Sequence, residues 1–202
     1  MTTALQALAY LSRQEPTPEY FVAFHDEINA EKNDRGAAIL LACNVEICLR
    51  FAIDRNLTVG SEAHKELFHT GGAPLRSFEA KIRIGYNMGL YRDQTKHNLD
   101  CIKGIRNAFA HAVIPIKFET PKVKAVCDTM AMPEICYPQA LDATTLEPRG
   151  ALPVGATSRL KFQKICEAIS HNLFMFGTAS RGIPSDPEVG VPMKRIMPKR
   201  LP

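Results

Sequence analysis

Apolar residues recur along most of this chain at intervals of three and four positions, the spacing typical of amphipathic α-helices. The longest such stretch, from Arg35 to about Arg55, is apolar on nearly every side. A helix without a polar face must be covered by other elements, so we expect this one at the centre of the fold. Asn33 or Asp34 precedes it and can cap its first turn.

Seven further stretches carry helical spacing or the residues that begin and end helices, and prolines and glycines fall between them. They predict helices over Ala4–Ser12, Glu19–Glu31, Ser61–Phe68, Ser77–Gly89, Arg92–His111, Lys122–Met130 and Ser158–Phe176. The chain is therefore predicted to be all-α, a single-domain bundle of about six to eight helices with an extended basic C-terminal tail.

The bundle divides along the chain into five segments. We expect N-terminal helices over 1–33, a helical core over 34–130, an irregular proline-rich loop over 131–157, a C-terminal helix over 158–178 and the tail over 179–202. The loop is indicated by four prolines and two glycines between Pro133 and Gly155 that follow no periodicity.

Composition and charge place the chain among cytoplasmic proteins that have no membrane partner. Its apolar fraction of 46% and charged fraction of 23% are ordinary for a soluble domain. The most apolar stretch, Gly36 to Ile53, contains Asn44, Glu46 and Arg50, and the N-terminus lacks the basic region and cleavage site of a secretory signal.

Six cysteines do not form a metal-binding pattern, because no two are spaced as C-x-x-C and no paired histidine motif accompanies them. Cys43, Cys48, Cys101 and Cys166 lie in apolar helical contexts and are expected to be small core residues. We therefore expect neither a metal nor a cofactor.

Most of the net charge of +4 lies at the C-terminal end of the chain. Residues 181–202 contain five basic and two acidic residues, a net charge of +3, and the rest of the chain is close to neutral. If the chain contacts nucleic acid directly, the candidate residues are Lys194, Arg195, Lys199 and Arg200.

The segment IRNAFAH, which ends at His111, collects residues able to act on a phosphate. Histidine moves protons near neutral pH, arginine stabilises negative charge, and asparagine orients a ligand, so Arg106, Asn107 and His111 are candidate catalytic residues for metal-independent phosphodiester chemistry. Arg106 and His111 lie about 140° apart on a regular helix. Only another helix or a second copy of the chain across a two-fold axis could complete such a site.

A structural interpretation of the same residues is also open. Glu46 lies within the apolar central helix, where an unpaired carboxylate is costly, so it is expected to pair with Arg106. Asn107 and His111 would then be interface or capping residues near a helix end. The sequence has no phosphate-binding glycine loop and no helix-turn-helix pattern.

Several blocks of sequence resemble the mannitol operon repressor (MltR) family. They begin at Arg35 (RGAAILLA), Pro74 (PLRSFEAKI), Tyr86 (YNMGL), Ile105 (IRNAFAH) and Phe118 (FETPKV, followed by Cys127). The resemblance covers about 34–130 and implies an all-helical transcriptional regulator, which would act through DNA or a protein partner.

The hexapeptide from Arg106 to His111 also resembles the Arg–polar–x–x–x–His motif of HEPN-domain ribonucleases. That resemblance implies a homodimeric bundle that cuts RNA without a metal, with Arg106 and His111 catalytic and Asn107 assisting. Three hypotheses therefore follow: a regulator of the repressor kind, which we favour, a ribonuclease, and a non-catalytic helical interaction module.

Overall fold

The computed structural model describes residues 4, 14–57, 61–133 and 152–180. In these ranges the chain forms only helices, which confirms the all-α prediction. They are α2 (Pro18–Ala30), α3 (Asp34–Asp54), α4 (Ser61–Phe68), α5 (Phe78–Asn87), α6 (Asp93–His111), α7 (Pro121–Thr129) and α8 (Ser158–Ser180). Several parts of the chain lie outside the described residues, among them the helix expected over Ala4–Ser12 (apart from Ala4), Cys136, most of the proline-rich loop, and residues 181–202 of the basic tail.

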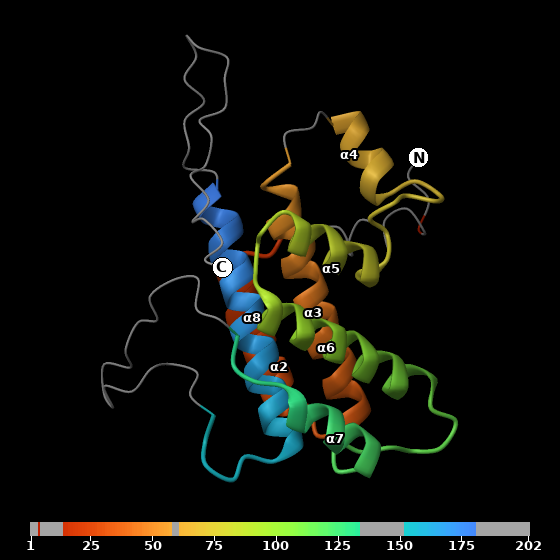
Figure 1. Cartoon of the computed structure of the whole chain (residues 1–202), viewed down its shortest axis with the longest axis vertical. Helices are drawn as coiled ribbons and strands as arrows, with labels where there is room; N and C mark the ends of the chain where they lie inside the picture. Colours follow the sequence, from red (N-terminus) through yellow and green to blue (C-terminus); the bar gives the residue numbers. More distant parts are fainter. Residues whose placement is uncertain (1–3, 5–13, 58–60, 134–151, 181–202) are drawn as a thin grey trace.

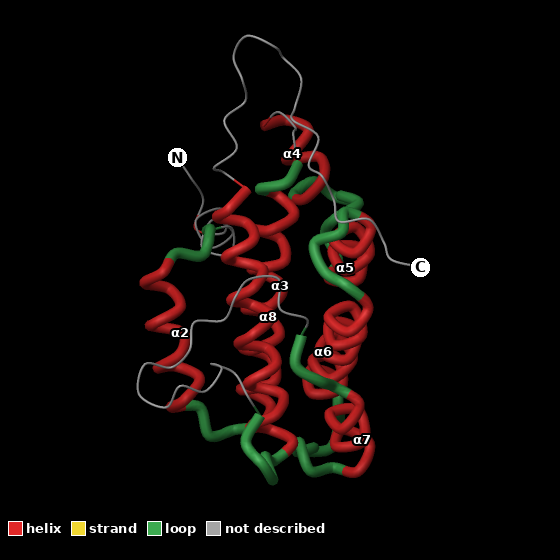
Figure 2. The backbone as a smooth tube through the Cα atoms, turned by 60° about the vertical axis from the view of Figure 1, so that its left-hand side comes forward, coloured by secondary structure: helices red, strands yellow, loops and turns green. Residues whose placement is uncertain are grey.

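The helices are arranged in three layers around α3 (Figure 1). Figure 2 shows α2 on one side, α3 and α8 side by side in the middle, and α5, α6 and α7 following one another on the other side. α3 packs against α8, α6, α5 and α2. Its central position is therefore confirmed, and α8 belongs to the same core.

α3 begins and is buried as its sequence predicts. The Asn33 side chain caps it by accepting hydrogen bonds from the backbone N–H of Arg35 at 2.8 Å and of Gly36 at 3.3 Å. Leu41 and Leu49 are fully buried. Cys43, however, is exposed, so its expected place in the core was wrong. It lies on the one stripe of α3 that solvent reaches, which the apolar sequence of this helix does not reveal.

By length and composition, α3 is the one helix in the described part of the chain that could cross a membrane. Most of its apolar stretch is buried inside the bundle. A buried core helix has the same composition, so the apolar character of α3 indicates little about a membrane.

A buried polar chain ties α2 to the middle layer of α3 and α8. Asn44, only 2% exposed, accepts a hydrogen bond from Tyr20 Oη of α2 at 3.0 Å and donates one to Ser170 Oγ of α8 at 3.1 Å. Burial raises the pKa of the Tyr20 hydroxyl and that of the neighbouring Cys48 thiol to about 12 each. Both groups are therefore neutral hydrogen-bonding or packing groups at physiological pH.

The C-terminal end of α6 is anchored to the start of α3. Arg35 Nη2 donates a hydrogen bond to the carbonyl oxygen of Ala112, the residue that follows α6, at 3.0 Å. Asp34 accepts from the backbone N–H of Phe118 at 3.0 Å and pairs with Arg159 of α8 at the same distance. These contacts fix the end of α6, which carries the candidate residues.

Candidate functional site

The described part of the chain contains an open pocket of about 470 Å³ where α3, α5 and α6 meet. It is lined by Glu46 of α3, Arg106 of α6 and the segment that leads into α5, namely Ala73, Pro74, Arg76, Ser77 and Phe78. Two of the predicted site residues, Glu46 and Arg106, therefore share one pocket.

The wall formed by α5 follows from its local sequence. Gly72 has a φ of 86°, a left-handed conformation that suits glycine, and it turns the chain after α4. Ser77 then begins α5, because its Oγ accepts a hydrogen bond from the backbone N–H of Ala80 at 3.1 Å. Phe78 and Ile82 face the core, and this orientation leaves Arg76 and Ser77 exposed at the pocket.

Glu46 has two cationic partners in the pocket. Its Oε1 is 2.6 Å from Lys81 Nζ, and its Oε2 is 3.7 Å from Arg106 Nη2. The Lys81 side chain is only 8% exposed and also donates to the carbonyl oxygen of Arg76 at 3.0 Å. Lys81 is thus the main partner of the carboxylate, and Arg106 is a second, longer-range partner.

The expected pair of Glu46 and Arg106 is therefore present, but as a loose contact. The closer partner of Glu46, Lys81, was not predicted from the sequence. A signal for Lys81 was available, since it lies at i+3 from Phe78 within the stripe that Phe78, Ile82 and Gly85 form on the buried face of α5. A lysine in such a stripe needs a carboxylate, and Glu46 is that carboxylate.

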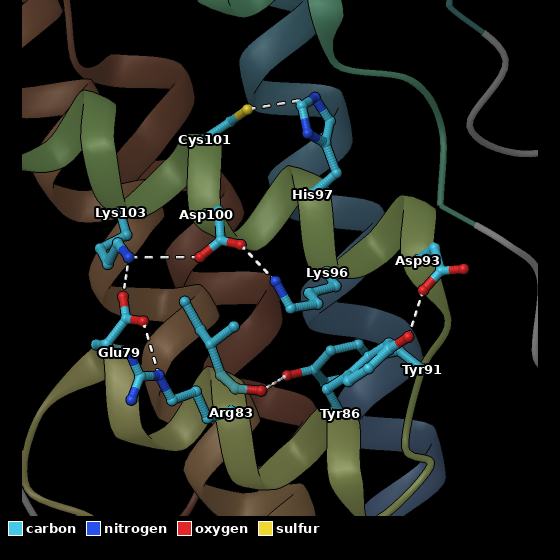
Figure 3. Close-up of polar contacts among 11 residues, drawn as sticks. Glu79, Arg83, Tyr86, Tyr91, Asp93, Lys96, His97, Asp100, Cys101 and Lys103 are labelled. Atoms are coloured by element: carbon cyan, nitrogen blue, oxygen red, sulfur yellow. Dashed lines mark hydrogen bonds and ion pairs between the residues drawn. The ribbon is translucent and has the colours of Figure 1, made fainter.

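A network of charged side chains holds α6 against α5 and so positions Arg106 (Figure 3). Lys103, one turn before Arg106, pairs with Glu79 of α5. Arg83, 74% exposed, pairs with the same carboxylate at 3.1 Å, but Glu79 and Arg83 both lie on α5, so this second pair does not join the two helices. Asp100 accepts from Lys103 at 3.4 Å and from Lys96 at 3.0 Å. The network directs this face of α6 towards the first turn of α5, where Phe78 lies.

The Arg106 guanidinium lies 5.9 Å from the centre of the Phe78 ring, a distance at which a cation–π attraction operates. Its side chain is 30% exposed, and its contact with Glu46 is longer than a hydrogen bond. Within the described residues no hydrogen bond uses its N–H groups. Arg106 is held in place with its donors unused.

Asn107 and His111 are not brought to this pocket. Both are exposed, and neither lines it. α6 continues as a regular helix to His111, so the separation of about 140° between Arg106 and His111 expected from the sequence is retained. In the described part of one chain, the three residues do not form a single catalytic group.

The thiols near these residues are not activated. The pKa of Cys43, one turn before Glu46, is raised by partial desolvation and by the charge of Glu46, which Arg106 partly offsets. On α6, five residues before Arg106, Cys101 Sγ lies 3.5 Å from His97 Nε2 (Figure 3). Burial raises the pKa of the Cys101 thiol as well. Both cysteines are protonated at neutral pH and are poor nucleophiles.

The remaining expectations concern metals and the tail. Among the described residues, no three His, Cys, Asp or Glu side chains are grouped so that they could hold a metal ion. Lys194, Arg195, Lys199 and Arg200 lie outside the described residues, so the proposed nucleic-acid contact stays a prediction.

Comparison of the chain with models of protein families, with curated proteins and with solved structures found no match.

Proposed function

We propose that the chain is a transcriptional regulator of the mannitol operon repressor kind, which acts by binding DNA or a protein partner and not by catalysis. The observation that carries the proposal against catalysis is the position of Arg106. Arg106 lines the pocket beside Glu46 and Phe78, whereas His111 is exposed on another side of α6 and does not line the pocket. Catalysis by a single chain would need both at one phosphate.

The arrangement of the blocks that resemble the family supports the proposal. The block that begins at Pro74 supplies the pocket wall up to Phe78 and also Lys81, and the block that begins at Ile105 supplies Arg106. Arg35, from the first block, donates to the carbonyl of Ala112 directly after the fourth. Segments far apart in the sequence thus form one contiguous part of the bundle.

The end of α6 offers a surface for a second copy of the chain. Val113 and Ile114, 100% and 70% exposed, lie two and three residues beyond His111. A second copy of the chain would cover these two apolar side chains. A homodimer formed here would double the number of basic tails available to a DNA operator, which suits a regulator.

A metal-independent ribonuclease is the second candidate, because the side chains of Asn107 and His111 are exposed and make no hydrogen bond to another described residue. Incubation of purified protein with end-labelled RNAs in EDTA separates the two proposals. A regulator leaves the RNAs intact. Cleavage by the wild-type protein that is absent with His111→Ala would replace the regulator by the ribonuclease.

A further inference from the structure

The pocket between α3, α5 and α6 carries an excess of positive charge. Three cationic residues, Lys81, Arg76 and Arg106, lie in or against it, and Glu46 is the one carboxylate among its lining residues. The close contact of 2.6 Å between Lys81 and Glu46 neutralises one cation with one anion. Arg76 and Arg106 are left with a net charge of about +2 at the pocket.

These two guanidinium groups have hydrogen-bond donors to spare. Arg76 is exposed, and its hydrogen bonds to described residues use its backbone: the carbonyl oxygen accepts from Lys81 and the N–H donates to the carbonyl of Ala73. Arg106 is held by an ion pair of 3.7 Å and by the Phe78 ring, and neither contact uses its N–H groups. A guanidinium with free N–H groups in a pocket is suited to bind the oxygens of an anion.

We propose that this pocket binds a small phosphate monoester, with Arg106 and Arg76 as the residues that hold the phosphate. A phosphate monoester carries about −1.5 to −2 charges at neutral pH, which matches the excess charge, and its tetrahedral oxygens accept from forked donors. A volume of about 470 Å³ is sufficient for a small molecule.

The other lining residues complete this assignment. The Ser77 hydroxyl accepts from the N–H of Ala80 and keeps its own proton to donate to the ligand. Phe78, Ala73 and Pro74 provide an apolar wall for the carbon skeleton. Lys81 stays on Glu46, so the carboxylate does not repel the phosphate. The inference does not depend on the regulatory function, because the pocket exists in either case.

Isothermal titration calorimetry with the full chain, in a buffer of low salt without phosphate, tests the proposal. The probes are glycerol 3-phosphate and inorganic phosphate, with glycerol and acetate as controls. We expect saturable binding of glycerol 3-phosphate with one site per chain and no binding of glycerol. Acetate should bind at least about ten-fold more weakly, because it has one charge and two oxygens. Binding of inorganic phosphate equal to that of the ester would also support the phosphate site.

The variants Arg106→Gln, Arg76→Glu and Arg83→Gln locate the site. Loss of Arg106 should weaken binding about ten-fold or more, because a charge-assisted pair is removed. Arg76→Glu reverses a charge on an exposed side chain and should weaken binding about ten-fold without affecting the fold. Arg83→Gln is the matched control, since Arg83 lies on α5, pairs with Glu79 and does not line the pocket.

The proposal is overturned if neither phosphate probe binds at about 10 mM, since an affinity below that level is negligible. It is equally overturned if acetate binds as well as glycerol 3-phosphate, or if Arg83→Gln weakens binding as much as Arg76→Glu does. Circular dichroism shows whether Arg106→Gln remains folded. If that variant unfolds, the site is tested by the affinities of Arg76→Glu and Arg83→Gln for glycerol 3-phosphate alone.

Discussion

Replacement of Glu46 by glutamine is expected to destabilise the bundle through Lys81. The substitution keeps the size of the side chain and removes the charge that lies 2.6 Å from Lys81 Nζ. Truncating one partner of a fully buried ion pair costs about 3–5 kcal/mol. The Lys81 side chain is 8% exposed and Glu46 is 24% exposed, so the pair is only partly removed from water. Lys81 also keeps its 3.0 Å hydrogen bond to the carbonyl of Arg76.

The expected loss is therefore about 2 kcal/mol of the free energy of unfolding, or about 4–8 °C in Tm for a chain of this size. Urea unfolding followed by circular dichroism measures it. Glu62→Gln is the control, because Glu62 makes an equally short contact of 2.6 Å with Lys65 but is 80% exposed. That substitution should change stability by less than about 0.5 kcal/mol.

Adding Lys81→Met to Glu46→Gln should recover at least about 1 kcal/mol, since the unpaired ammonium is then gone. A loss for Glu46→Gln no larger than that for Glu62→Gln would refute the reasoning, because Lys81 would then not depend on its carboxylate.

Two further predictions concern the packing of α5 and the basic tail. Gly85→Ala should lower the free energy of unfolding by about 1–2 kcal/mol, because an added Cβ would lie 2.9 Å from Tyr91 Oη and 3.1 Å from Leu49 Cδ1. Gly104→Ala on α6 is the control and should raise the free energy of unfolding by about 0.5–1 kcal/mol, because nothing lies within 4 Å of its added Cβ. Urea unfolding measures both variants, and an equal change in stability for the two would contradict the close packing of Gly85 against Tyr91 and Leu49. Deletion of residues 181–202 should weaken DNA binding and reduce the slope of log affinity against log salt by up to about 4.5, about 0.9 for each of the five basic residues removed. An unchanged slope in fluorescence anisotropy would exclude the tail from the contact.

The helices could be predicted from the sequence because each carries its own periodicity and boundary residues. The helices predicted over Ser77–Gly89 and Lys122–Met130 each begin within one residue of the prediction, α5 at Phe78 and α7 at Pro121. The central position of α3 followed from its apolar surface, which only other helices can cover. The exposure of Cys43 could not be predicted, because a helix that is apolar on nearly every side gives no sign of which side the other helices leave uncovered.

The pocket was predictable only in part, because it depends on how helices distant in sequence meet. A buried carboxylate demands a cation, and this rule identified Glu46 as a paired residue. The same rule could not decide whether the cation would be Arg106 of α6 or Lys81 of α5, because the sequence does not show how these two helices meet α3. The separation of Arg106 from His111, in contrast, follows from the geometry of one helix and was available at once.

The regulatory proposal is tested most directly by transcript abundance in cells of the source organism that lack this chain. The cells are complemented with the wild-type chain or with the His111→Ala variant, and all transcripts are sequenced. The proposal predicts that a confined set of transcripts changes when the chain is absent and that both forms restore it, because His111 takes no part in catalysis. Restoration by the wild-type chain alone, with broad changes across unrelated transcripts, would contradict it.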